Sequence, residues 1–425
     1  MESAEGLTRK LRVEVPAEQI DQEILKRLRS AGKNAKLPGF RPGKVPAKVV
    51  EQRYGAQIRQ DVMTEFMQSS YSEALQKEDL YPAGNPDIVP ESMDGSDGLK
   101  YTATFEVFPE ISLTGLDTIE VTRPILDVGE ADIDQMIENL QRQKGEWKAV
   151  ERKSKKGDQV IVDFDGTLKG EAIPNGKGEN VTVELGAGRM LEDFEKALTG
   201  VSGGDSIEFK VKYPKEYPQD DLAGKKADFK AEVHEVKAMD LPPIDDELAA
   251  AYGVTEGGLQ KLREDVSQNM QNEAQQKIRN DVKDQALNGL LDANDIEVPQ
   301  ALVDREVHNM QHEAMKQMGT EDHSQAPPAE NFKEPALKRV KLGLLLQEFI
   351  SSEKIELDED RIRGRITEMF AGYDDPDAIV SAYMGNPQLR QQIEPMVLED
   401  QAIEALIEKG SEKSKTVTFK EYMNA

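Results

Sequence analysis

The chain has 425 residues, and its 81 acidic and 54 basic side chains give a formal net charge of −27. This charge argues against general affinity for nucleic acid or for anionic membranes, and the length predicts several domains rather than one core. The absence of cysteine excludes thiol nucleophiles, disulfides and thiolate metal sites. No apolar run reaches about 18 residues, so we expect a cytoplasmic protein with no membrane partner.

The first part of the chain predicts a compact α+β unit. Residues 8–15 alternate apolar and polar side chains, as a half-buried strand does. The stretch GFRPGKVP (39–46) interrupts a helical pattern, because its two glycines and two prolines disfavour any regular element. The predicted elements are a strand at 8–15, a helix from Ala17, a loop at 39–46, a helix at about 47–54, a longer helix through Ile58 and Leu75, a turn at 82–86 and a strand at 101–108.

The middle of the chain predicts a small antiparallel sheet domain with one short helix, preceded by a helix at 132–147. Strand-like runs alternate there with turns rich in glycine and proline. The domain is expected to end near residues 241–245. Its predicted elements are strands at 159–166, 181–186, 206–213 and 227–236 and a helix at about 191–198.

Beyond Asp245 the pattern is almost entirely helical. The predicted helices span about 257–293, 298–319, 333–351, 358–371, 377–384 and 396–409. Methionines recur along them, at 270, 310, 315, 318, 369, 384 and 396. Two interpretations stay open for these methionines: ordinary core packing, or a pliable surface that accepts many client sequences.

One segment of this acidic chain is strongly basic. Between Lys26 and Arg59 there are ten basic residues and one acid, Glu51, which gives a local charge of +9. A solvated helix face would mix both signs. We therefore interpret the segment as an electrostatic dock for a polyanion or an acidic partner, with Phe40 as an aromatic anchor, and keep a solubility patch as the alternative.

These motifs resemble the trigger factor family of ribosome-associated bacterial chaperones. GFRPGKVP followed by RYG at 53–55 resembles the family's loop signature, and PAGNP (82–86), FEVFPEI (105–111) and ANDIEVP (293–299) follow the family order. The resemblance implies that the loop docks on the large ribosomal subunit near the exit tunnel, on a ribosomal protein and adjacent rRNA. The implied ribosome-binding residues are Gly39, Phe40, Arg41, Pro42, Gly43 and Lys44, with Pro42 standing where a basic residue is common.

The middle domain resembles the FKBP type of peptidyl-prolyl isomerase. DFDG (163–166) and LGAGRMLEDFEKAL (185–198) occupy the places of a family strand and of the strand-to-helix floor of its pocket. The implied catalytic pocket consists of Phe164, Ile173, Met190, Leu191, Phe194, Tyr217 and Phe229. Isomerisation needs no nucleophile or metal, because the barrier of about 18–20 kcal/mol arises from amide resonance and a dry apolar cradle favours the twisted, less polar amide.

The fold class that we expect is multidomain α+β. It comprises an N-terminal α+β ribosome-binding domain, an inserted FKBP-like antiparallel β domain and an elongated all-α C-terminal chaperone domain. The expected boundaries are 1–112 for ribosome binding, 113–149 for a linker arm belonging to the C-terminal domain, 150–240 for the isomerase and 241–425 for the helical chaperone domain.

The function that we expect is an ATP-independent, ribosome-associated chaperone that binds nascent chains and isomerises X-Pro bonds. Neither GxxxxGK[ST] nor GxGxxG occurs, so no nucleotide cofactor is predicted. His308 and His312 are spaced as on one helix face, but they lack the HExxH pattern and no metal is predicted. Two alternatives remain: a free prolyl isomerase without ribosome docking, and a holdase whose isomerase module is inert, suggested by Ile173 and Pro174 at positions where an aromatic and an acid are usual. Homodimerisation of the free protein also stays open.

Overall fold

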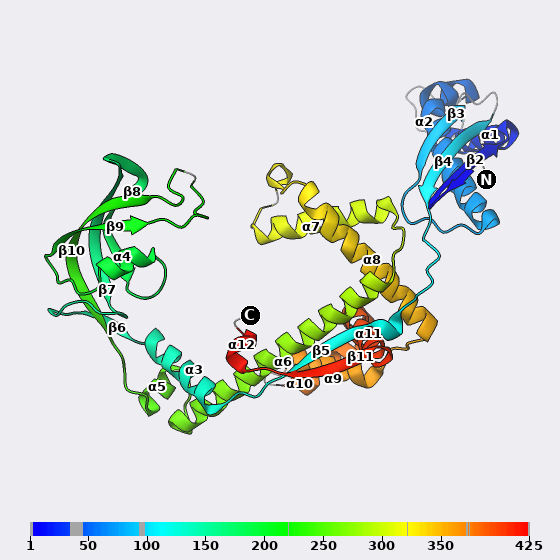
Figure 1. The fold of residues 1–425 in the computed structure, drawn as a ribbon. Coiled ribbons are helices and arrows are strands. Elements are labelled where there is room, and N and C mark those ends of the chain that lie inside the picture. Colours follow the sequence, from blue (N-terminus) through cyan, green and yellow to red (C-terminus); the bar gives the residue numbers. More distant parts are fainter. Residues whose placement is uncertain are drawn as a thin grey trace. The chain divides into compact units, whose positions relative to one another are not determined.

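The structure is a computed structural model that describes residues 3–34, 46–92, 98–219, 221–320, 322–370, 373 and 375–423. Figure 1 gives the order of its helices and strands along the chain. The chain forms two compact units, one of residues 1–123 and 280–414 and one of residues 124–279 and 415–425. Each unit is described by itself.

The first unit begins with a four-stranded antiparallel sheet in the order β1-β2-β4-β3. Its strands are β1 (Ser3–Glu5), β2 (Thr8–Val15), β3 (Asp87–Ser92) and β4 (Leu99–Glu106). Buried residues face one another across β2 and β4, as in the pairs Val13–Tyr101 and Val15–Leu99. The strand predicted at 8–15 is confirmed, because its period-2 pattern is the burial pattern of β2.

Two helices pack against this sheet, α1 (Ala17–Asn34) and α2 (Ala47–Glu78). The sequence predicted two helices in the region of α2, and that prediction is wrong, since α2 continues through Gly55. A glycine inside a helix costs only about 1 kcal/mol relative to alanine, and buried Val50 and Val62 anchor the helix on both sides of it.

The rest of the first unit is mainly helical. Its helices are α7 (Gln300–Gln317), α8 (Glu330–Glu353), α9 (Glu359–Met369), α10 (Pro376–Gly385) and α11 (Pro387–Lys409), and α6 (Gly258–Ala293) precedes them in the chain. The sequence placed the start of the last helix at 396; α11 begins nine residues earlier because Asn386 caps it and Pro395 is tolerated inside it. Strands β5 (Glu120–Ile125) and β11 (Ser411–Thr416) pair with each other and were not predicted.

Amide side chains of α6 and of the residue after it bind the chain before β5 and within β5. The buried amide of Asn294 accepts from Thr114 N–H at 2.8 Å and donates to Thr114 C=O at 3.2 Å. Gln285 makes the same pair of bonds with Thr122, at 2.8 and 3.0 Å. The backbone N–H and C=O groups of Thr114 and Thr122 are thus both satisfied by amide side chains.

Among the described residues, the second unit contains a five-stranded antiparallel sheet, four helices that lie wholly within it and the first part of α6, residues 258–279. The helices are α3 (Glu130–Gln143), α4 (Glu192–Ala197), α5 (Asp246–Ala251) and α12 (Phe419–Met423). The strands are β6 (Glu146–Ala149), β7 (Gln159–Leu168), β8 (Glu171–Glu184), β9 (Ser206–Lys212) and β10 (Lys226–Asp240). They run in the order β6-β10-β7-β8, and β9 pairs with the first half of β10.

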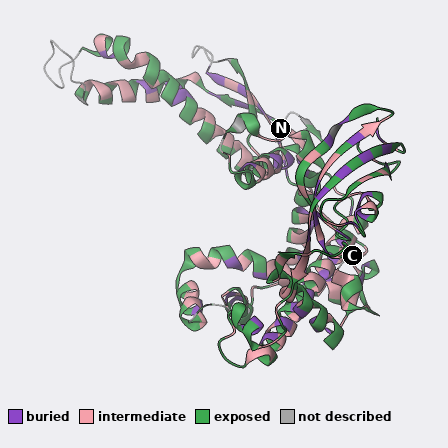
Figure 2. Cartoon of the chain, turned by 90° about the vertical axis from the view of Figure 1, so that its left-hand side faces the viewer, coloured by how far each residue is buried: buried purple, intermediate pink, exposed green. Residues whose placement is uncertain are grey.

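Two predicted boundaries in this unit are wrong. The helix predicted to reach Trp147 ends at Gln143, because Trp147 belongs to β6 and pairs with Met239 of β10. The strand predicted at 181–186 begins at Glu171, where residues rich in glycine and asparagine still pair with β7 through two register shifts. Figure 2 shows the stripes of buried and exposed positions that result along these strands.

Candidate functional site

Four phenylalanine rings form the centre of the sheet domain. Phe194 of α4 packs edge to face against Phe164, Phe209 and Phe229, with ring centroids 5.2, 5.1 and 5.5 Å apart. Phe209 and Phe229 are paired residues of β9 and β10, and their rings stack at 6.0 Å. We call these four residues the aromatic cluster. Such edge-to-face pairs contribute beyond simple burial and fix the orientation of each ring.

Two glycines provide the space that two of these rings occupy, because neither glycine has a side chain. A Cβ atom on Gly166 would lie 2.5 Å from Cε1 of Phe229, and one on Gly178 would lie 2.8 Å from Cε1 of Phe164. Neither distance is compatible with a side chain other than hydrogen. The glycine of the DFDG stretch is therefore required by the packing of the opposite ring.

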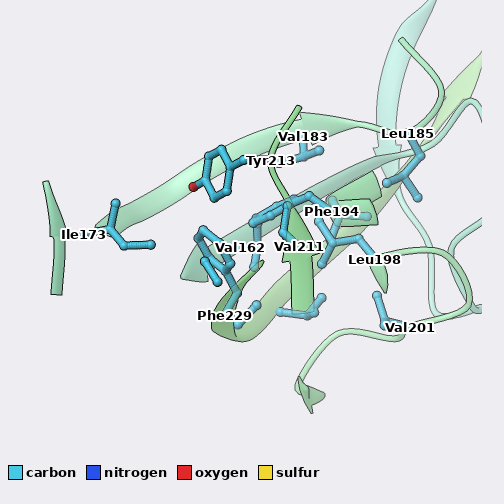
Figure 3. Packing of buried hydrophobic residues seen from close by; sticks show 14 of the residues in the cluster. Val162, Ile173, Val183, Leu185, Phe194, Leu198, Val201, Val211, Tyr213 and Phe229 are labelled. Atoms are coloured by element: carbon cyan, nitrogen blue, oxygen red, sulfur yellow. The ribbon is translucent and has the colours of Figure 1, made fainter. Parts of the chain in front are cut away.

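The structure brings all seven predicted pocket residues to one hydrophobic cluster. Phe194, Phe229 and Ile173 are buried in it, and Phe164, Met190, Leu191 and Tyr217 pack against it while staying partly exposed. Figure 3 shows Ile173 at one end of this cluster and Leu185 at the other. The partly exposed residues give the cluster an apolar face that a substrate can reach.

Sequence reasoning missed two aromatic residues of this site. Phe209 belongs to the aromatic cluster, and the buried Tyr213 packs edge to face on Tyr217 at 4.8 Å. Both lie on the alternating face of the strand predicted at 206–213, so that alternation could have found them. Burial raises the pKa of the Tyr213 hydroxyl above its usual value.

A buried carboxylate holds the segment that precedes β7. Asp158 is 2% exposed, and its two oxygens accept from the Arg152 guanidinium at 2.5 and 2.9 Å. The N–H of Lys155 donates to the same carboxylate at 2.9 Å. The hydrogen bonds from Arg152 hold the pKa of Asp158 below its usual value. Since Asp158 also pairs with Leu185 through the backbone at 2.9 Å, this group anchors the loop after β8.

A hollow of about 500 Å³ lies on the other face of the same sheet. Its side chains form two cross-strand rows, Asp165–Lys230–Glu208 and Thr167–Asp228–Lys210, which alternate with the inward-facing Phe209 and Phe229. Lys210 and Asp228 are paired at 3.1 Å, with both side chains mostly exposed. The charged side chains thus point away from the aromatic cluster, although Phe209 and Phe229 of the cluster also line the hollow.

The docking residues Gly39, Phe40, Arg41, Pro42, Gly43 and Lys44 lie outside the described residues. The helices on either side of them are described, and their ends carry exposed cations. Arg29, Lys33, Lys48, Arg53 and Arg59 are exposed, and none forms an ion pair with a residue that the structure describes. We call these five residues the cationic helix ends. Lys26 and Arg27, by contrast, pair with Glu23 at 2.8 and 3.1 Å.

The methionines of the helical region divide into three groups, of which the partly buried Met310 and Met384 pack against core clusters. Met270 and Met315 are buried, so core packing accounts for them, whereas Met318, Met369 and Met396 are at least 40% exposed. Leu337 and Tyr373 add two further exposed apolar side chains. The region therefore offers both a packed core and exposed, pliable apolar positions.

Neither a metal site nor a membrane span is found in the described part of the chain. No group of three or more His, Asp or Glu side chains is arranged there to hold a metal ion. None of its helices combines the length and the apolar character that crossing a bilayer requires.

Comparison with protein families defines the class of this protein, a multidomain chaperone with an FKBP-type isomerase domain. Family models describe residues 1–140 as bacterial trigger factor protein, 150–236 as FKBP-type peptidyl-prolyl cis-trans isomerase and 258–408 as the trigger factor C-terminus. Trigger factor from Thioalkalivibrio sulfidiphilus is 45% identical over all of this chain and 97% of its own length. Trigger factor from Shewanella baltica is 43% identical over 100% and 98%.

The chain belongs to the trigger factor family. It is a chaperone with an N-terminal ribosome-binding domain and an FKBP-type peptidyl-prolyl isomerase domain. The predicted fold class, enzyme class and chaperone function are thereby confirmed.

Proposed function

We propose that X-Pro bonds are isomerised over the aromatic cluster, with Ile173, Met190, Leu191 and Tyr217 as the walls of the pocket. The observation that carries this proposal is the convergence of all seven predicted residues on one partly open apolar cluster. A proline ring that packs on Phe164, Phe194 and Phe229 is removed from water together with its amide. The planar amide is stabilised by a polar resonance form, so this loss of hydration destabilises it. The twisted amide is less polar and loses less, so the barrier falls.

The main chain supplies a hydrogen-bond donor at the same place. The N–H of Leu191 donates no hydrogen bond within the described residues, although Leu191 itself packs on the cluster. It is thus free to bind a substrate carbonyl next to the proline. A fixed donor in a dry site positions the peptide while the bond rotates.

The test compares two truncations of buried residues in the same cluster. Phe194→Ala removes the floor of the proposed pocket, while Leu198→Ala removes a fully buried neighbour that the proposal leaves outside it. Proline-limited refolding of a protein substrate should slow more than tenfold with the first variant and less than threefold with the second. Equal rates for the two variants would place the active site elsewhere.

We propose that the loop Gly39–Lys44 docks on the large ribosomal subunit near the exit tunnel, on protein and rRNA. The cationic helix ends support this proposal: five exposed cations that pair with no described residue, in a chain of net charge −27, favour an anionic partner. Co-sedimentation with ribosomes tests it: the wild-type protein should pellet, and Phe40→Ala/Arg41→Ala should stay in the supernatant. A double variant that pellets like the wild type would contradict the proposal.

The helical region is proposed to bind nascent chains through its exposed apolar side chains, in the cytoplasm and without ATP. Within this proposal the domains follow the predicted boundaries 1–112, 150–240 and 241–425, with 113–149 as an arm of the helical domain. Homodimerisation of the free protein would compete for the same apolar surface. Sedimentation at rising protein concentration, with and without an unfolded client, distinguishes client binding from dimerisation. An unfolded client should dissociate any dimer.

A further inference from the structure

A buried glutamate closes the loop that carries Met190, one of the proposed pocket walls, and that ends next to another, Leu191. Glu195 lies on α4, is 9% exposed and forms no ion pair with any described residue. Its Oε2 accepts from Gly186 N–H at 2.8 Å, and its Oε1 accepts from Met190 N–H at 3.3 Å. The carboxylate therefore joins the two ends of the loop 186–190 to the helix beside Phe194.

Burying a carboxylate without a cation is costly unless its oxygens are hydrogen-bonded. Here both carboxylate oxygens of Glu195 accept hydrogen bonds from backbone N–H groups of a single loop. The loop is strongly turned, with φ of +91° at Gly186 and +70° at Gly188, conformations that glycine adopts readily. Few other hydrogen bonds hold this loop. The main-chain hydrogen bonds at its two sides run from Ala187 N–H to Glu184 C=O and from Phe194 N–H to Leu191 C=O.

We infer that Glu195 is a positioning residue for prolyl isomerisation: it fixes the loop 186–190 and so sets the places of Met190 and Leu191 against the aromatic cluster. This inference rests on the proposed location of the active site. Glu195 itself does not touch the substrate. It acts by keeping the loop in the one conformation that places the Met190 side chain and the free Leu191 N–H at the pocket.

The inference predicts a specific kinetic signature. If the loop is in place for only a fraction of the time, the apparent affinity for substrate falls by that fraction, while the bound complex reacts normally. Glu195→Gln keeps the size of the side chain but leaves one acceptor oxygen for two N–H donors. We expect its KM to rise at least fivefold and its kcat to stay within twofold of the wild-type value.

The matched control is Glu192→Gln, on the same helix. Glu192 is exposed, and its partner is the side chain of Lys196 at 2.6 Å, so its replacement should leave KM and kcat unchanged. Phe194→Ala in the same assay tests the site itself, because it should lower kcat/KM whether or not Glu195 positions the loop. A normal rate for Phe194→Ala would overturn the location of the site and, with it, this inference.

Amide hydrogen exchange of the full-length protein provides the second readout. In the wild type the N–H groups of Gly186 and Met190 should exchange at least tenfold more slowly than those of Gly188 and Arg189. Glu195→Gln should remove that protection and leave the amides of β10 protected. An unchanged KM, or a kcat that falls without a change in loop protection, would show that Glu195 only stabilises the fold.

Discussion

The aromatic cluster and the cationic helix ends place their side chains in opposite environments. Phe194 and Phe229 are at most 5% exposed and pack against neighbouring rings, and Gly166 leaves room for the ring of Phe229. Arg53 and Arg59 are exposed on α2 and pair with no described residue. Changes to the cluster should therefore lower stability and activity together, whereas changes to the cationic ends should alter binding alone.

The largest expected effect is on the stability of the cluster. Phe229→Ala removes a buried ring with three aromatic neighbours and should lower the free energy of unfolding of the sheet domain by about 3–5 kcal/mol. Trp147, the only tryptophan, lies in β6 of the same sheet, so its fluorescence during denaturant unfolding reports on this domain. Phe108→Ala, at a ring that is 46% exposed, is the control and should change little.

The next effect concerns the Arg152–Asp158 pair. Asp158→Asn leaves the guanidinium with a neutral partner and should cost about 2 kcal/mol at pH 7, as expected for a hydrogen bond to a charged group. The pKa of Asp158 is lowered in the folded state, so its contribution is complete above the ordinary value of 3.8 and is lost as the pH falls through the folded-state pKa.

The difference between wild type and Asp158→Asn should therefore shrink as urea unfolding is repeated from pH 7 down to pH 3. Asp228→Asn provides the comparison, since the exposed pair Lys210–Asp228 should contribute less than about 1 kcal/mol at any pH. A constant difference across the pH range would mean that the charge of Asp158 does not contribute to stability.

Charge reversal at the cationic helix ends should weaken ribosome binding without unfolding the protein. Arg53→Glu/Arg59→Glu should reduce ribosome affinity about tenfold or more at low salt, and the difference should narrow as salt is raised, because counterions screen exposed charges. Lys26→Glu is the control for a paired cation, since Lys26 already forms an ion pair with Glu23, and it should reduce ribosome affinity less. Equal losses for paired and unpaired cations would argue against direct contact by the cationic ends.

The smallest expected effect belongs to the exposed methionines. Met318→Ser/Met369→Ser/Met396→Ser should change stability by less than about 0.5 kcal/mol per site, since these side chains are largely exposed. Suppression of aggregation of an unfolded client should nevertheless fall about twofold to threefold. Met315→Ser should behave in the opposite way, because Met315 is buried and contributes to the core.

Regular alternation could be read from the sequence, as β2 demonstrates. The seven pocket residues came instead from the resemblance to the FKBP type of isomerase, and the structure gathers them at one hydrophobic cluster. The helix boundaries predicted at Gly55 and Pro395 were wrong. The free-energy cost of each residue within a helix is outweighed by packing on both sides of it. The strand 171–180 was missed since its glycines and asparagine resemble a turn, and only pairing with β7 makes it a strand. Nothing local marks Glu195, Asp158 or Asn294 as buried, because their partners lie elsewhere in the fold.

The most direct test of the account measures ribosome co-sedimentation and prolyl isomerisation on the same two variants. Phe40→Ala/Arg41→Ala should lose ribosome binding and keep wild-type isomerase activity. Phe194→Ala should keep ribosome binding and lose isomerase activity. Loss of both activities in either variant, or of neither, would contradict the separation of the docking segment from the aromatic cluster.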